Sequence, residues 1–188
     1  LDVFSEKSYD TATLNDIAKK ANVTRGAIYW HFEDKIDILK ELTNIHLGDF
    51  LKKTYSETLV LEGNSLKKIE NLFMDYFEHF LNNPDNLKYK RIIDIKMAFN
   101  ENNLFVQDIF GEIIDNMIKK TNEIIIYGQS KNEIRQDIYA VFFTGTILNW
   151  ITEFDRMDCL NTKSGFSFLN NKDLILKKIL EILKPFKE

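Results

Sequence analysis

Cysteine, proline and glycine are all scarce in this chain of 188 residues, which holds one cysteine, two prolines and seven glycines. A single cysteine, Cys159, cannot form an internal disulfide, so a reducing cytoplasm is the expected compartment. So few turn-forming residues exclude a β-protein with many tight turns. No apolar run approaches the roughly 20 residues that a membrane-spanning helix needs, and no signal peptide is apparent, so no membrane partner is expected.

The sequence also lacks the spacing patterns of common catalytic and metal sites. Its three histidines, His31, His46 and His79, are scattered, and no His-x-x-x-Glu or Cys-x-x-Cys spacing gathers metal ligands. There is no glycine-rich phosphate loop and no nucleophile elbow. An enzyme or a carrier on a helical scaffold is therefore kept only as the alternative class of function. Neither a metal nor a cofactor is expected.

The charge balance does not favour nucleic-acid binding. The formal net charge is −4 and the isoelectric point is near 5.5. Residues 1–47 hold six basic and eight acidic residues, a net charge of −2. Any DNA-binding function must therefore rest on a local pattern of residues.

Apolar residues recur at three- and four-residue spacing along most of the chain, which predicts an all-α protein. The clearest face predicts a helix over residues 65–81, with Ser65 as its N-cap and Pro84 just beyond its end. Further helices are expected over about 104–127, with Gly128 as the C-cap, over about 133–155 and over about 171–184.

The first 47 residues differ, because Tyr9 to Thr11 and Ala21 to Thr24 keep their helices short. We therefore expect two domains, a three-helix helix-turn-helix domain over residues 1–47 and a larger helical bundle over residues 48–188. A helix over about 35–58 should join them.

The segment over residues 13–32 has the features of a helix-turn-helix. Thr13 and Thr24 are good N-caps, and each opens a helix of about two turns. Asn22 occupies the turn and tolerates a left-handed conformation. The expected buried positions are Leu14, Ile17, Ala18 and Ala21 in the first helix and Val23, Ile28 and Phe32 around the second.

The second helix would enter the major groove by its N-terminal turn. Arg25 can reach a guanine edge or a phosphate, while Gly26 and Ala27 let the backbone approach a thymine methyl. The alternative is that Arg25 and Lys35 are solvated surface charges and that Tyr29 and Trp30 lie in the core. The candidate DNA contacts are Thr13, Thr24, Arg25, Gly26, Ala27, Tyr29, Trp30, His31 and Lys35.

From Phe4 to Leu39 the sequence resembles the DNA-binding domain of the TetR/AcrR family of bacterial repressors, and the run Arg25-Gly26-Ala27-Ile28-Tyr29-Trp30-His31-Phe32 is its most specific part. Ser8 and Asn22 depart from the family pattern, which usually has glycine there. The resemblance implies that the start of the first helix and a basic arm precede Leu1. It also implies a ligand-binding C-terminal domain that forms a two-fold dimer on palindromic operator DNA.

The segments 91–95, 133–137 and 144–150 are similar to the multidrug-efflux branch of this family. That similarity implies repression of an efflux operon, relieved by a small hydrophobic inducer. Repression of a metabolic pathway, with a fatty acyl compound as the signal, is the alternative.

An apolar pocket lined by a few polar groups is what such an inducer would need. Thr144 is a polar residue in an apolar stripe, at a position that matches a pocket residue of the efflux branch; its hydroxyl could equally bond its own helix backbone. The aromatic and Met residues could be ordinary core. The candidates are Phe77, Met97, Phe110, Phe143, Thr144 and Ile147.

The last two helices are expected to pair across a two-fold axis as a four-helix bundle, with Gly145 permitting close approach. Inducer binding would then move the helix over about 35–58 and change the separation of the two recognition helices.

Overall fold

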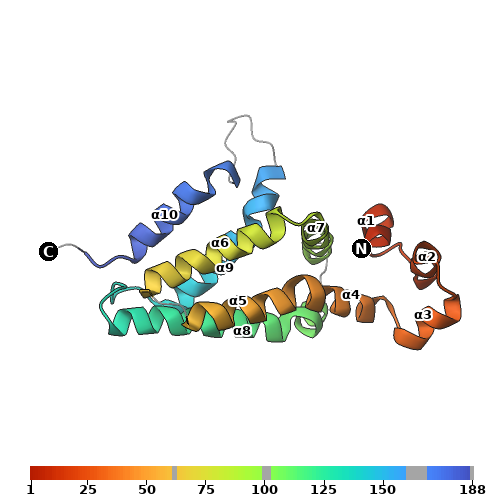
Figure 1. The fold of residues 1–188 in the computed structure, drawn as a ribbon, viewed down its shortest axis with the longest axis horizontal. Helices are drawn as coiled ribbons and strands as arrows, with labels where there is room; N and C mark the ends of the chain where they lie inside the picture. Colours follow the sequence, from red (N-terminus) through yellow and green to blue (C-terminus); the bar gives the residue numbers. More distant parts are fainter. Residues whose placement is uncertain (61–62, 99–102, 160–168, 187–188) are drawn as a thin grey trace. The chain divides into compact units, whose positions relative to one another are not determined.

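The computed structural model describes residues 1–60, 63–98, 103–159 and 169–186, and these residues form helices joined by turns, with no strand among them (Figure 1). The predicted all-α fold is confirmed. In the described part of the chain, no helix combines the length and the apolar character needed to cross a membrane.

The chain divides into two compact units. The first holds residues 1–52 and 78–114, and the second holds residues 53–77 and 115–188. The domain boundary predicted at residue 47 stays a prediction. The helices of the first unit are α1 (Asp2–Lys7), α2 (Leu14–Lys20), α3 (Arg25–His31), α4 (Lys35–Thr43) and α7 (Pro84–Ala98). Those of the second are α9 (Ala140–Cys159) and α10 (Lys172–Leu183), preceded by a 3₁₀ turn at Leu169–Asn171. Three helices contribute to both units: α5 (Asp49–Val60), α6 (Ser65–Leu81) and α8 (Asn103–Ser130).

The helix predicted over about 35–58 is interrupted by a π-helical turn, Asn44–Gly48, between α4 and α5. Polar contacts hold this turn inside the first unit. His46 Nδ1 lies 2.7 Å from Asn86 Oδ1, and His79 Nε2 lies 2.6 Å from the His46 carbonyl. Just before the turn, the Tyr89 hydroxyl donates to Thr43 Oγ1 at 2.9 Å. Single π-helical turns inside α-helices are rare and are often found at functional sites.

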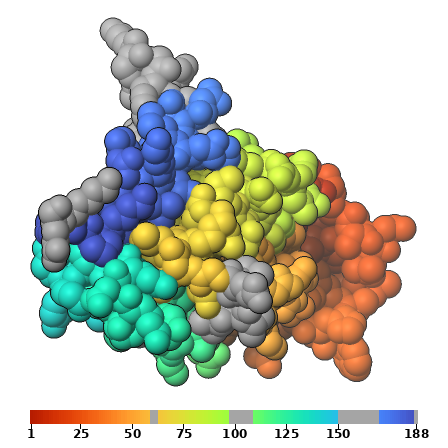
Figure 2. All heavy atoms as spheres, turned by 60° about the vertical axis from the view of Figure 1, so that its left-hand side comes forward, coloured from red at the N-terminus to blue at the C-terminus, as the bar shows by residue number. Residues whose placement is uncertain are grey.

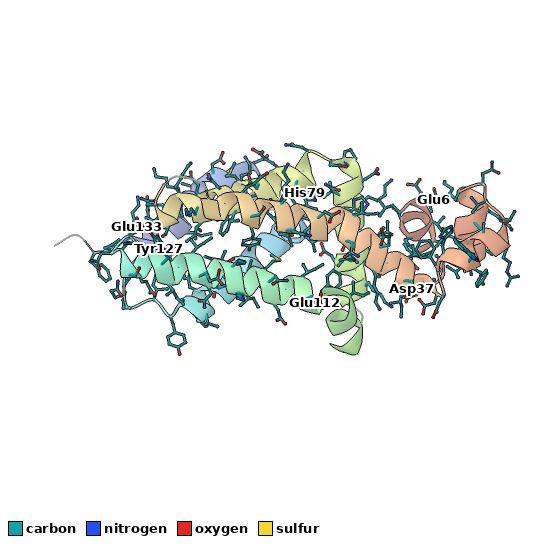
Figure 3. The ribbon with its side chains drawn as sticks, turned by 60° about the horizontal axis from the view of Figure 1, so that its bottom comes forward. Glu6, Asp37, His79, Glu112, Tyr127 and Glu133 are labelled. Carbon is teal, nitrogen blue, oxygen red and sulfur yellow. The ribbon has the colours of Figure 1, made fainter. Side chains whose placement is uncertain are left out.

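In the second unit, α5 and α8 lie side by side in both ribbon views (Figures 1 and 3), and the Tyr55 hydroxyl lies 2.8 Å from Thr121 Oγ1 across them. Helix α10 lies beside α6 (Figures 1 and 2). It buries Leu176, Ile179 and Leu183, which recur at helical spacing.

The helix predicted over about 133–155 begins seven residues later, at Ala140. Asn132 adopts a left-handed φ of 56°, and the amides of Glu133 and Ile134 both donate to the Gly128 carbonyl. The Gln129 side chain then donates to the carbonyls of Arg135 and Ile138. Ile134 is fully buried, but it lies in a turn and not in a helix. Both the preceding residues Gly128 and Gln129 and distant residues of the chain bond to this turn.

Two predicted helix caps are also wrong. Helix α8 continues past Gly128 to Ser130. Glycine is required at 128 because a Cβ there would lie 2.7 Å from Ser65 Cβ and 2.8 Å from Ile134 Cδ1. Helix α6 is capped by Asn64, whose Oδ1 accepts from the Lys67 amide at 3.0 Å. Ser65 instead donates its own amide to Glu133 Oε2 at 2.7 Å.

Candidate nucleic-acid interface

Helix α2 begins with a complete capping box. Thr13 Oγ1 accepts from the Asp16 amide at 3.1 Å, while the Thr13 amide donates to Asp16 Oδ2 at 3.1 Å. Lys7 donates to Asp16 Oδ1 at 2.7 Å and so ties α1 to α2. The hydrogen bond from Lys7, together with those from Thr13, lowers the pKa of the Asp16 carboxyl to about 2. The N-cap predicted at Thr13 is therefore present, and a second ion pair between Lys20 and Glu6, at 2.7 Å, reinforces the same contact.

The turn between α2 and α3 is built as predicted. Asn22 has a φ of 55°, and the Val23 amide returns to the Ala18 carbonyl at 3.0 Å. Ser8 also has a positive φ, 65°. Both departures from the family's glycine pattern thus fall where the backbone is left-handed, which explains the family's preference for glycine there. Asn and Ser adopt this conformation at some cost.

The buried stripe of the module is narrower than predicted. Leu14, Ala18 and Ile28 are buried, and Ile17 and Phe32 are half-buried. Ala21 and Val23 are exposed, so the prediction was wrong for both. They flank Asn22, where the tight turn directs the chain out to solvent, and a period of 3.6 residues no longer applies.

Helix α3 presents its polar and aromatic residues to solvent. The Ala27 amide donates to Thr24 Oγ1 at 3.1 Å, which confirms the cap. Trp30 is 82% exposed and Tyr29 is also exposed, so neither is a core aromatic. The Arg25 guanidinium lies 5.3 Å from the centre of the Tyr29 ring. The other exposed candidates on this helix are Gly26, Ala27 and His31.

Acidic residues are absent from α3 and its immediate flanks. No residue from 24 to 32 is acidic. Of the three acidic residues that follow, Glu33, Asp34 and Asp37, the last two serve α4. Asp34 Oδ1 accepts from the amides of Ile36 and Asp37, and Asp37 Oδ2 accepts from the Glu33 amide. These carboxylates are therefore used to cap a helix N-terminus, where negative charge is favoured.

Lys35 lies in a different environment from the other candidates. Its ammonium donates to the carbonyls of Tyr9 and Asp10, at 2.8 and 2.9 Å, and lies 5.0 Å from the centre of the Tyr9 ring. It therefore holds the start of α4 against the loop after α1. Nothing in the spacing of the sequence signals this inward contact, because a lysine at a helix start is usually solvated.

The candidate inducer-binding residues divide between the units. Phe77, Thr144 and Ile147 are buried in the second unit, and Phe143 is half-buried there. Phe110 is buried in the first unit, and the Met97 side chain lies outside the described residues.

Thr144 is fully buried, and its Oγ1 has no hydrogen-bond partner among the described residues. Thr146, by contrast, donates to the Phe142 carbonyl at 3.0 Å. A bond from Thr144 to its own helix backbone is therefore not what the structure contains. Elsewhere in the described chain, no three His, Cys, Asp or Glu side chains gather as a metal site.

Comparison with known proteins identifies the module. Residues 1–42 match the sequence profile of the bacterial regulatory proteins of the tetR family. AcrR of Shigella flexneri is 52% identical over 78 residues, which are 42% of this chain and 36% of that protein. Residues 1–42 are therefore a DNA-binding module of the TetR/AcrR type of transcription regulators.

A chain with this module is a helix-turn-helix repressor and not an enzyme. The similarity extends beyond the module: the probable acrEF/envCD operon repressor of Escherichia coli K12 is 23% identical over 192 residues, covering 97% of this chain and 82% of that repressor. The fold of the present chain is similar to that of FadR from Bacillus subtilis, which was solved in complex with stearoyl-CoA. The TM-score is 0.77 and the identity is 19%, over 97% of this chain and 94% of FadR.

Proposed function

We propose that this repressor binds a palindromic operator as a dimer through α3, is released by a small hydrophobic inducer, and controls a multidrug-efflux operon. One observation carries the proposal: α3 exposes a cation, a glycine and two large aromatic residues, and the module's own core uses none of them. Large exposed aromatic residues beside a cation need a partner, and the absence of acidic residues from 24 to 32 suits a polyanionic one.

The direct contacts would come from the first turn of α3. Arg25 would read a guanine or bind a phosphate. A Cβ added at Gly26 would meet only Thr24 Oγ1, at 3.9 Å, so the backbone is open to a close approach. Tyr29, Trp30 and His31 would line the sugar-phosphate walls, and the amides at the N-termini capped by Thr13 and Thr24 would face phosphates. Lys35 we assign to positioning α4, because its ammonium is already bonded.

The dimer would form through α9 and α10. Val141 and Phe142 are large apolar residues on the exposed side of α9, and Leu174 and Ile182 are exposed on α10. Nothing lies within 4 Å of a Cβ added at Gly145, so this side of α9 can accept a closely packed neighbour. Two helices from each copy would make a four-helix bundle, as a self-complementary two-fold interface requires.

The inducer would bind in the second unit near Thr144. A buried hydroxyl without a hydrogen-bond partner is costly unless a ligand or water completes it. The apolar neighbours on its helix, Phe143 and Ile147, suit a hydrophobic ligand with one polar group. The operator would be released if the inducer-bound protein favours a different orientation of α4 relative to α5. The π-turn between these two helices is the place where this change would occur.

The efflux role rests on the resemblance of the segments 91–95, 133–137 and 144–150 to the multidrug-efflux branch. The probable acrEF/envCD operon repressor of E. coli K12, which matches 97% of this chain, supports it. The second candidate is a fatty acyl sensor, because the fold is similar to that of a regulator solved with stearoyl-CoA.

A gel-shift measurement tests operator binding. The probe is the intergenic DNA upstream of the gene, at fixed salt, and Tyr29→Ala is compared with wild type. We expect operator affinity to fall about tenfold, a loss of about 1.4 kcal/mol, because the variant loses the contact of the aromatic side chain with the sugar-phosphate backbone. Tyr127→Ala is the matched control, since Tyr127 is as exposed but lies on α8. Undiminished binding by Tyr29→Ala would sink the assignment of α3.

Adding stearoyl-CoA or a hydrophobic drug such as chloramphenicol to the same assay separates the two candidate signals. Thr144→Val keeps the shape of the side chain and removes the hydroxyl. Because the hydroxyl is unpartnered, the melting temperature should not fall, while the inducer concentration needed for release should rise. A variant that melts lower and responds normally would contradict the proposed site.

A further inference from the structure

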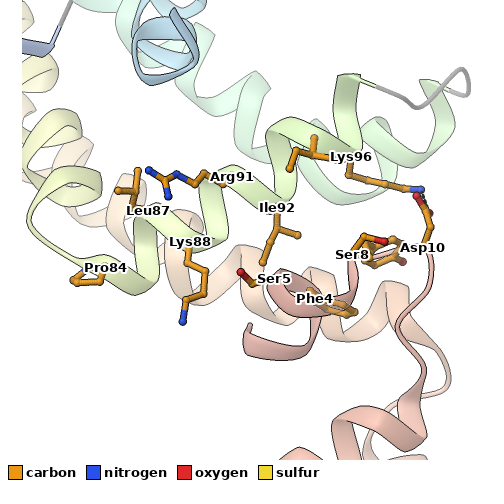
Figure 4. A pocket seen from close by; sticks show the side chains of 12 residues that line it. Phe4, Ser5, Ser8, Asp10, Pro84, Leu87, Lys88, Arg91, Ile92 and Lys96 are labelled. Atoms are coloured by element: carbon orange, nitrogen blue, oxygen red, sulfur yellow. Dashed lines mark hydrogen bonds and ion pairs between the residues drawn. The ribbon is translucent and has the colours of Figure 1, made fainter. Parts of the chain in front are cut away.

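An open groove of about 470 Å³ lies between α1 and α7, within the first unit (Figure 4). Small-molecule sites usually occupy about 300–1,000 Å³, so this groove has the capacity of one. None of the candidate inducer-binding residues lines it. If it binds a ligand, it is therefore a site distinct from the one proposed above.

The floor of the groove is apolar. Phe4 of α1 and Ile92 of α7 are buried, and Leu87 is half-buried. Ile95, at the other end of the floor, is 60% exposed. An isoleucine that lines a groove and remains open to water gains from any apolar group that covers it.

The charges along the groove are mostly positive. Lys88, Arg91 and Lys96 line it, against one carboxylate, Asp10. Lys88 pairs with Asp2 at 2.7 Å, and Lys96 pairs with Asp10. Arg91 is exposed, and among the described residues it forms no hydrogen bond or ion pair.

The register of α7 places this cation inside the apolar stripe. Leu87, Arg91 and Ile95 follow one another at four-residue spacing, so they share one face of the helix. Figure 4 shows Arg91 lying along α7 towards Leu87. A guanidinium offers five donors in a planar fork, which matches a carboxylate, sulfonate or phosphate.

We infer that the groove between α1 and α7 is a second ligand site, which takes a small amphipathic anion. The apolar part of the ligand would lie over Phe4, Ile92 and Ile95, and its acidic group would pair with Arg91. A cationic ligand would be repelled by the lining, and a neutral one would leave the Arg91 donors without an anionic partner. Because the ligand would touch both helices, it would fix α1 against α7.

This fixation matters for operator binding only if the repressor function proposed above is correct, because α1 packs on α2 through the Lys7 and Lys20 ion pairs. Binding itself does not depend on that function. The two can therefore be tested separately.

The experiment uses the full chain with isoleucine methyl groups labelled for NMR, titrated with decanoate and, in parallel, with decan-1-ol. The methyl groups of Ile92 and Ile95 report on the groove, and that of Ile147 reports on the second unit. Arg91→Gln removes the unpaired cation. Lys52→Gln, an exposed cation of the first unit outside the groove, is the matched control.

We expect decanoate to shift the Ile92 and Ile95 methyl signals in a saturable way, and Arg91→Gln to weaken its binding by about tenfold. Decanol binding should be equal in wild type and Arg91→Gln, and Lys52→Gln should bind decanoate as wild type does. Shifts confined to Ile147, or equal weakening by both variants, would overturn the site. If the protein does not bind operator DNA but decanoate still shifts the methyl signals, the result would count against the repressor function alone.

Discussion

Helices α3 and α9 both present large aromatic side chains to solvent, but the residues around these side chains differ. On α3, Trp30 and Tyr29 stand beside a cation and an open glycine, with no acidic residue from 24 to 32. On α9, Phe142 is 75% exposed and stands beside Val141. The neighbouring residues therefore suit different partners: a polyanion for α3 and, in the dimer proposed above, a second apolar surface for α9.

The largest expected effect comes from placing a charge on the α9 surface. Phe142→Glu should raise the dimer dissociation constant by about 100-fold or more, because burying an unpaired carboxylate costs several kcal/mol. Sedimentation velocity measures the shift to monomer. Ile126→Glu, at an exposed position on α8, is the control and should remain dimeric. A Phe142→Glu protein that sediments like wild type would show that the α9 surface is not the interface.

Next in size is the loss of the α3 cation. Arg25→Ala should lower operator affinity by about 10- to 100-fold and relax the sequence preference, because a bidentate contact to guanine contributes about 1–3 kcal/mol. Sedimentation and melting temperature should stay unchanged, since Arg25 is exposed. Binding measured against a series of salt concentrations distinguishes the two roles: a phosphate contact would reduce the salt slope and leave sequence preference alone.

The helix-turn-helix could be predicted from the sequence because its structure depends on near neighbours. The caps at Thr13 and Thr24 each bond to an amide three residues on, and Asn22 sets the turn by its own backbone conformation. The predictions that were wrong in this module concern contacts between residues far apart in the sequence. Val23 was expected in the core because it is apolar, and Lys35 was expected to contact DNA, but the surroundings of both side chains depend on where the rest of the module lies.

In the second unit, contacts between distant residues decide more of the local structure. The turn before α9 is held by residues far away in the chain: Glu133 bonds to Ser65, and the Arg135 amide donates to the Leu183 carbonyl. No local pattern contains these contacts, so the apolar spacing of Ile134 and Ile138 was extended into a helix. The α9 surface was expected from the family resemblance, whereas the residues that place the start of α9 were not.

Substitutions of two separate glycines on α8 test those distant contacts. Gly128→Ala should lower the free energy of unfolding by about 1–2 kcal/mol, because the new methyl group collides with Ser65 and Ile134, which pack against it on both sides. Gly111→Ala is the matched control: nothing lies within 4 Å of its Cβ, so replacing a helical glycine should stabilise by about 0.5–1 kcal/mol. Denaturant titration measures both. Equal effects of the same sign would mean that the turn before α9 does not depend on Gly128.

The smallest expected effect is a pH dependence of stability that comes from His79, which lies on neither the α3 nor the α9 surface. Burial lowers the pKa of His79, the hydrogen bond to the His46 carbonyl opposes this, and the nearby His46 side chain adds to the lowering. Since the folded pKa lies below the unfolded value of about 6.5, the unfolded chain binds more protons as the pH falls through this range. Stability should therefore be fully present above pH 6.5 and decline below it. Melting curves from pH 7.5 to 5.5 measure the decline, and His79→Gln, which can still donate to the His46 carbonyl, should flatten it. An equally steep decline in the variant would assign the pH dependence to groups other than His79.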